Sequence, residues 1–136
     1  MSNKTIHILL VEDDPFLAEI YVTRLEAEQF TVALSRNGEE GLQKIKETHP
    51  DLVLLDLVLP DRDGFSILEE VKKDEATKAI PVVILSNLGE KQDIARGMSL
   101  GAADYIVKAH FTPSEVVAKV TRVIQKQETP SESSKS

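Results

Sequence analysis

Five polar side chains that could form a catalytic or binding site stand where short apolar stretches of the sequence end. They are Glu12, Asp13, Asp56, Ser86 and Lys108. Carboxylates in a chain without cysteine favour a hard cation, Mg²⁺ or Ca²⁺ rather than Zn²⁺. A lysine beside them cannot bind a cation but can hold an anion, and phosphate is the anion that fits best. The residue types therefore indicate a site that handles phosphate together with a divalent cation.

Among these residues, Asp56 is the strongest single indication of a functional site. It interrupts the otherwise apolar run of residues 52–59, where an unpaired carboxylate would be costly to bury. Alone, it could equally cap a loop at the end of a strand. Glu12 and Asp13 shift the balance toward a cation site, because clustered carboxylates repel one another unless a cation lies among them. Asp14, the next residue, is better explained as the N-cap of a helix.

The elements that must position these side chains alternate regularly along the chain. Short apolar stretches predict strands at residues 6–11, 31–35, 52–56, 81–86 and 105–108. A helical pattern follows each strand, and the last helix opens with a capping box at residues 112–115. Apolar strands that alternate with helices predict an α/β fold, a parallel sheet with helices on both faces. Ligands bind at the carboxyl edge of such a sheet, so we expect the five polar side chains to meet there.

Length and composition bound the domain organisation and exclude several classes of function. The 136 residues, 41% hydrophobic and 29% charged, correspond to one ordinary globular domain. We assign residues 5–126 to this domain, residues 1–4 to an N-terminal lead and residues 127–136 to a disordered polar tail. The net charge of −7 argues against nucleic-acid binding, and no apolar stretch is long enough to span a membrane. We therefore expect a cytoplasmic protein with neither kind of partner.

Four segments together resemble the receiver domain of two-component response regulators. They are VEDD at residues 11–14, LLDLVLPDRDG at 54–64, VVILSN at 82–87 and GAADYIVK at 101–108. Each segment alone is a weak signal, but all four in this order at strand ends are specific, and the resemblance covers residues 5–126. It implies the flavodoxin-like doubly wound fold, with a five-stranded parallel sheet of order 2-1-3-4-5 and helices on both faces.

The resemblance implies that Asp56 is phosphorylated. A sensor histidine kinase or a phosphotransfer protein would donate the phosphoryl group, and the Asp56 carboxylate would be the nucleophile. Mg²⁺ would be the cofactor, because it bridges carboxylates and phosphoryl oxygens. Four groups would hold this ion, namely Glu12, Asp13, Asp56 and the backbone carbonyl of Val58.

The resemblance also implies how phosphorylation would change the conformation of the domain and its binding of partners. Ser86 and Lys108 would bind phosphoryl oxygens, and Ser86 and Tyr105 would move together as a switch. The protein would be a signalling switch, not an enzyme apart from catalysing its own phosphorylation and dephosphorylation. Partner binding would change on the face formed by the fourth helix, the fifth strand and the fifth helix. A domain over residues 5–126 leaves no room for an output domain, so we expect output through a downstream protein, with the chain a monomer or a phosphorylation-dependent homodimer.

Three departures from the family pattern modify these expectations. Lys108 is followed by Ala109 rather than proline, so we expect a trans peptide bond there. Asn87 replaces a small residue and either narrows the entry to the site or adds a hydrogen bond. Val58 and Leu88 are apolar at positions that tune attack by water in the family, so we expect the phosphoryl group to persist.

Three other functions remain open on the sequence. A pseudo-receiver that binds partners without being phosphorylated is favoured by Ala109 and Asn87 but opposed by the intact acidic cluster. A small Mg²⁺-dependent aspartyl-phosphate phosphatase needs a nearby general acid, as in a D-x-D pattern, and Val58 stands at that position. A flavin-binding domain is disfavoured by an aromatic content of 4% and by the lack of a Ser/Thr/Gly-rich phosphate loop.

Overall fold

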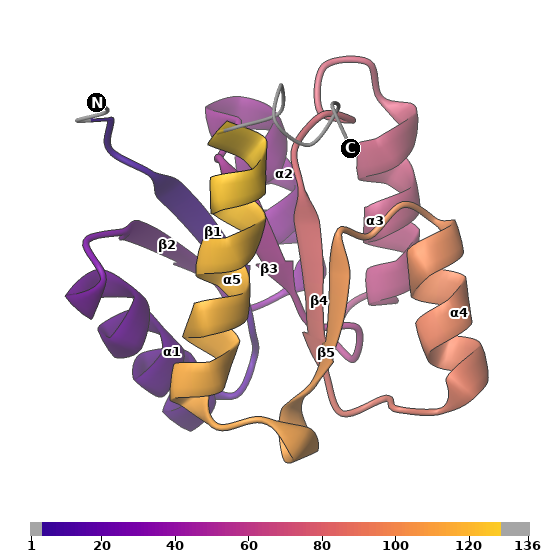
Figure 1. The fold of residues 1–136 in the computed structure, drawn as a ribbon. Helices are drawn as coiled ribbons and strands as arrows, with labels where there is room; N and C mark the ends of the chain where they lie inside the picture. The colour runs from indigo at the N-terminus through magenta and orange to yellow at the C-terminus, as the bar shows by residue number, and fades with distance from the viewer. Residues whose placement is uncertain (1–3, 129–136) are drawn as a thin grey trace, which may run out of the picture.

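The computed structural model describes residues 4–128, which alternate between strand and helix five times (Figure 1). The strands are β1 (His7–Val11), β2 (Thr31–Ser35), β3 (Leu52–Leu55), β4 (Val82–Ser86) and β5 (Asp104–Val107). The helices are α1 (Pro15–Ala27), α2 (Gly38–Thr48), α3 (Gly64–Lys73), α4 (Lys91–Ser99) and α5 (Pro113–Glu128), with a 3₁₀ helix η1 (Lys108–His110) after β5. The predicted alternation is confirmed.

The strands form one parallel sheet in the order β2-β1-β3-β4-β5. Because β1 pairs with both β2 and β3, Val11 lies beside Ser35 on one side and Leu55 on the other. At the same edge, Ser86 at the end of β4 lies beside Val107 of β5. The predicted order 2-1-3-4-5 is confirmed, and the carboxyl ends of the strands share one edge, the lower one in Figure 1.

Helices cover both faces of the sheet and bury a separate apolar cluster on each (Figure 1). On one face, Leu25 of α1 and Val120 of α5 are completely buried. On the other face, Ile45 of α2 and Leu68 of α3 are completely buried. On this face α4 lies beside α3. With both faces covered, every residue of β3 and β4 is buried, which explains why these strands read as continuous apolar runs.

Local polar signals start the helices where the sequence predicts. The Asp14 carboxylate accepts the N–H groups of Phe16 at 2.9 Å and Leu17 at 3.2 Å, so Asp14 is the N-cap of α1. At the start of α5 the Thr112 N–H donates to the Glu115 carboxylate at 2.8 Å, and the Glu115 N–H donates to the Thr112 hydroxyl at 3.1 Å. Both caps are confirmed.

Some boundaries differ from the predicted ones. β3 ends at Leu55 and β5 at Val107, so Asp56 and Lys108 lie just beyond their strands instead of being the last strand residues. α5 continues to Glu128, two residues into the segment assigned to the tail. The apolar pattern used for the prediction ends with the last buried residue, Ile124, whereas the helix itself extends past it. Residues 1–3 and 129–136, which hold most of the predicted lead and tail, lie outside the described part. Within residues 4–128 no helix is both long and apolar enough to cross a membrane.

Candidate functional site

A pocket at the carboxyl edge of the sheet collects side chains from the connections after β1, β3, β4 and β5. It is lined by Glu12, Asp13, Asp14, Leu17, Asp56, Val58, Ser86, Asn87 and Lys108. Every residue predicted to bind metal or phosphate is among them. Tyr105, the predicted switch residue, does not line the pocket.

Main-chain hydrogen bonds fix the acidic residues just beyond the strands. The N–H of Glu12 donates to the carbonyl of Ser35 at 2.9 Å, and the N–H of Asp56 donates to the carbonyl of Val11 at 3.1 Å. These bonds continue the pairing of β1 with β2 and β3 by one step. Because neighbouring strands lie about 4.8 Å apart, the two acidic residues are brought to adjacent positions on the sheet edge.

Three carboxylates form a cluster that suits a divalent cation. Glu12, Asp13 and Asp56 each offer an oxygen, and these oxygens lie within 4.8 Å of one another. Glu12 is 1% exposed and Asp56 6%, whereas Asp13 faces solvent at the mouth of the pocket. An all-oxygen donor set with one solvent-facing ligand fits Mg²⁺, which keeps part of its water shell. No histidine belongs to this cluster, the one group of its kind within residues 4–128.

Lys108 lies inside the carboxylate cluster. Its Nζ is 2.6 Å from Oε1 of Glu12 and 2.9 Å from Oδ2 of Asp56. Burial lowers the pKa of Lys108, but the hydrogen bonds to Glu12 and Asp56 outweigh this effect and hold the pKa above its ordinary value. Burial raises the pKa of Glu12, and the Lys108 ammonium opposes this shift only in part. One ammonium among three carboxylates leaves the cluster two negative charges in excess, the charge that one Mg²⁺ would balance.

Lys108 reaches the carboxylates although the peptide bond that follows it is trans, as predicted. There is no cis peptide bond within residues 4–128, so the Lys108–Ala109 bond is trans. Lys108 begins η1 directly after β5, and its side chain is 8% exposed. The lysine therefore reaches both carboxylates without a proline after it.

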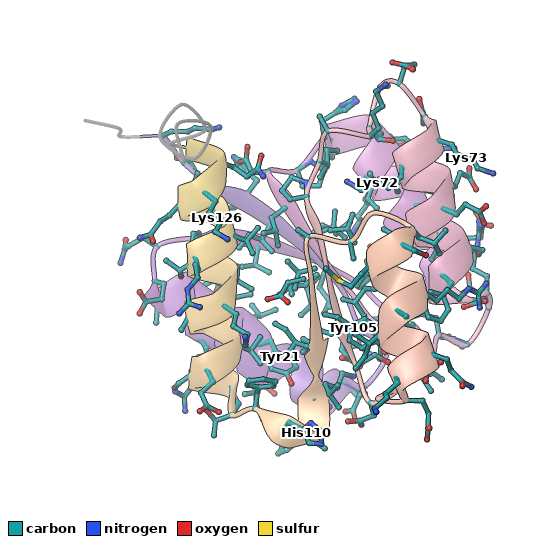
Figure 2. The ribbon with its side chains drawn as sticks, turned by 45° about the vertical axis from the view of Figure 1, so that its right-hand side comes forward. Tyr21, Lys72, Lys73, Tyr105, His110 and Lys126 are labelled. Carbon is teal, nitrogen blue, oxygen red and sulfur yellow. The ribbon has the colours of Figure 1, made fainter. Side chains whose placement is uncertain are left out.

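A hydrogen-bonded chain leads from the pocket to Tyr105. Ser86 is completely buried, and its Oγ accepts the N–H of Leu88 at 3.4 Å. The Tyr105 hydroxyl donates to the carbonyl of Leu88. Burial, helped by the negative charges of Asp93 and Asp56, raises the pKa of Tyr105 to about 12. Tyr105 lies between β5 and α4 (Figure 2), so Leu88 connects the pocket to the α4 side of the molecule.

Two residues near the site were not identified from the sequence. Asp61 and Arg62, in the loop after Asp56, both contact α2. The motif PDRDG marks a turn, but nothing within it shows which distant helix the loop contacts. Asp14 and Leu17, assigned to the first helix, also line the pocket.

The chain matches the family model "Response regulator receiver domain" over residues 8–121. It is 37% identical over 128 residues to the DNA-binding response regulator MtrA of Mycolicibacterium smegmatis, covering 94% of this chain and 54% of that protein. Among solved structures, the non-phosphorylated HemR receiver domain of Leptospira biflexa has a TM-score of 0.81 at 38% identity, covering 88% of this chain and 94% of that one. A CheY-like receiver domain protein of Methanospirillum hungatei has a TM-score of 0.86 at 26% identity, covering 93% and 99%.

The chain spans about half the length of the curated relatives it matches. The similarity therefore concerns the domain that this chain and those longer regulators share.

Proposed function

The chain belongs to the response regulator receiver domain family, and from this premise we propose that Asp56 is the residue that accepts the phosphoryl group. The family is the phosphoacceptor switch of two-component signalling. The donor we propose is a phosphohistidine on a sensor kinase or on a phosphotransfer protein. The Asp56 oxygen forms a bond to phosphorus while the bond between phosphorus and the donor imidazole nitrogen breaks.

The observation that carries this proposal is the environment of Asp56. The Asp56 side chain is 7% exposed, and its carboxylate lies 2.9 Å from the Lys108 ammonium and shares the pocket with Glu12 and Asp13. A buried carboxylate that only capped a loop would need neither a second buried acid nor a lysine. A carboxylate that receives a phosphoryl group needs cationic partners for the additional negative charge.

Mg²⁺ would be held by Glu12, Asp13, Asp56 and the carbonyl of Val58, and once bound it would neutralise charge on the phosphoryl oxygens. Each of these residues lines the pocket. Lys108 would leave the Asp56 carboxylate, whose attacking oxygen becomes the bridging oxygen of an acyl phosphate, and pair with a phosphoryl oxygen instead. The Ser86 hydroxyl would donate a hydrogen bond to another phosphoryl oxygen. These groups are the domain's own contribution to catalysing its phosphorylation.

The same contacts offer a route from phosphorylation to a partner. When the Ser86 hydroxyl turns to a phosphoryl oxygen, its contact with the Leu88 N–H is weakened, and Leu88 also holds the Tyr105 hydroxyl. We place the resulting change on the face formed by α4, β5 and α5, where a downstream protein or a second copy would bind. The face would exist in two conformations, one favoured without and one with phosphate. Phosphorylation shifts the equilibrium between these conformations only as far as it stabilises one more than the other.

The test is incubation with acetyl phosphate and Mg²⁺, followed by intact mass measurement. We expect the wild-type chain to gain the mass of one phosphoryl group and to lose the gain when EDTA replaces Mg²⁺. Asp56→Asn should show no gain. Asp51→Asn is the matched control, because Asp51 is also an aspartate next to β3 but lies at the opposite end of the strand, and it should behave as wild type. No gain in the wild type, or an equal gain in Asp56→Asn, contradicts the proposal.

A further inference from the structure

The loop between β3 and α3, residues 57–63, is fastened to the start of α2 by a carboxylate. Oδ1 of Asp61 accepts the N–H of Gly38 at 2.7 Å, and its Oδ2 accepts the N–H of Glu39 at 2.8 Å. The first amides of a helix have no acceptor within the helix. The N-cap side chain of α2 accepts only the Glu40 N–H, at 2.9 Å, so the loop supplies the acceptors that α2 lacks.

Arg62 makes a second attachment between the same elements. Its guanidinium lies 2.9 Å from the Glu39 carboxylate of α2, 3.2 Å from the Ser66 hydroxyl and 3.3 Å from the Glu70 carboxylate of α3. Single exposed ion pairs contribute little, but one guanidinium with three partners fixes the direction of the side chain. The loop is therefore held to α2 from two consecutive residues.

The close approach of the loop requires a glycine at the start of α2. A Cβ on Gly38 would lie 2.7 Å from Cγ of Arg62, 2.8 Å from Cδ1 of Ile67 and 3.2 Å from Oδ1 of Asp61. Contacts this short would push the loop away from the helix. Gly38 and Asp61 are thus complementary parts of one junction, although they are far apart in the sequence.

The other end of the loop is part of the phosphoacceptor pocket. A bridge between Val58 and Asp63 closes the loop, and the N–H of Gly64 donates to the carbonyl of Leu57 at 2.9 Å. Val58 lines the pocket together with Asp56. In a short closed loop, a displacement at Asp61 is transmitted to Val58, because few main-chain torsion angles are left to absorb it.

We propose that Asp61 and Arg62 are positioning residues that hold the backbone carbonyl of Val58 in place for Mg²⁺. This inference rests on the proposed function, which assigns that carbonyl to the metal. Groups that orient metal ligands typically change metal affinity by 10–100-fold when they are removed. Since Asp61 acts through the main chain of the loop, we expect Asp61→Asn to weaken Mg²⁺ binding by about tenfold, at the lower end of that range.

The experiment uses Mg²⁺ alone, titrated calorimetrically into the metal-free full chain. Gly38→Ala disturbs the same junction without changing any charge, so it should weaken Mg²⁺ binding in the same direction. Glu47→Gln removes a carboxylate from α2 away from the junction, where it accepts a hydrogen bond from Gln43 at 3.0 Å. Asp51→Asn removes an aspartate that accepts the His7 N–H at 2.8 Å at the far end of the sheet. Both controls should stay near the wild-type affinity.

Amide hydrogen exchange in EDTA is a second measurement, which reports how firmly the loop is held to α2 without depending on the metal. We expect faster exchange at Val58 and Gly38 in Asp61→Asn, with the strands still protected. If Asp61→Asn binds Mg²⁺ no more weakly than the two controls, the inference is overturned. If Asp61→Asn fails to fold, the Mg²⁺ affinity of Gly38→Ala is compared with that of the two controls instead, and an affinity no weaker than theirs overturns the inference. A wild-type chain that binds no Mg²⁺ contradicts the proposed function instead, and hydrogen exchange still tests whether Asp61 restrains the loop.

Discussion

At the scale of single residues, Lys108 is the only cation in direct contact with the buried carboxylates of the described pocket. It lies within ion-pair distance of both Glu12 and Asp56, and each of these carboxylates is almost fully buried. Burial of a charge is costly unless an opposite charge accompanies it. The lysine and a bound Mg²⁺ would thus perform the same electrostatic task, and either one should partly compensate for loss of the other.

This argument predicts the effect of Lys108→Met. Breaking a fully buried ion pair costs ~3–5 kcal/mol, and we expect about 1–3 kcal/mol here because the mouth of the pocket remains in water. The free energy of unfolding, from urea titrations in EDTA, should fall by this amount, and Mg²⁺ should recover part of it. Lys78→Met is the control, since Lys78 pairs with Glu75 in solvent and its loss should cost less than about 1 kcal/mol. Equal losses in the two variants, or no recovery with Mg²⁺, contradict the prediction.

Tyr105 gives a prediction about pH. Burial, together with the charges of Asp93 and Asp56, raises the pKa of Tyr105 from 10.0 to about 12. Between these values the folded chain keeps the phenol proton that the unfolded chain has lost, so this residue lowers the stability of the fold as the pH rises. The stability advantage of the wild type over Tyr105→Phe should therefore shrink from pH 10 to pH 12. Tyr21 and Lys108 are present in both proteins, so their titrations cancel; parallel stability curves contradict the assignment.

At the scale of elements, Gly97 determines how closely α4 lies on the sheet. A Cβ at this position would lie 2.6 Å from Cδ1 of Ile84 in β4 and 3.0 Å from the Tyr105 ring in β5. Ile84 is completely buried, so a shift of its side chain would disturb the packed core around it. The glycine therefore allows the helix to pack against the two strands and sets the space in which the Tyr105 ring lies.

Gly97→Ala separates this packing effect from helix propensity. Alanine favours a helix over glycine by about 1 kcal/mol, whereas overpacking a core costs ~1–3 kcal/mol. Since the neighbours are a buried isoleucine and an aromatic ring, we expect a net loss of about 1 kcal/mol in thermal or urea unfolding. The Tyr105 ring signals should also shift in NMR spectra. Gln92→Ala, at an exposed site of the same helix, is the control, and a stabilised Gly97→Ala would contradict the packing argument.

At the scale of the whole molecule, the position of the site follows from the order of the strands. After β1 the chain crosses to α1 on one face, and after β3 it crosses to α3 on the opposite face (Figure 1). β1 and β3 are neighbours, so their connections diverge and leave a crevice at the carboxyl edge. Glu12 and Asp13 lie at the end of β1 and Asp56 at the end of β3, which brings three of the acidic residues of a −7 chain to this crevice.

The sequence alone determined the features whose signals lie within a few residues of one another. The alternating apolar stretches predicted the five strands of a parallel sheet, and the caps at Asp14 and Thr112 were predicted from adjacent residues. The order of the strands was implied by the resemblance to receiver domains. The acidic residues were identified as one group because parallel strands share a carboxyl edge. Their roles in binding Mg²⁺ and phosphate stay predictions until the variants above are measured.

The tertiary structure decided the contacts between residues that are far apart in the sequence. Lys108 meets Asp56 across 52 positions, and Asp61 meets Gly38 across 23. Strand register and the paths of loops set such distances, and both depend on packing throughout the core rather than on local preferences. For the same reason the sequence could name Asp56 and Lys108 as members of one site, but not the second carboxylate that Lys108 contacts or the helix that holds the loop after Asp56.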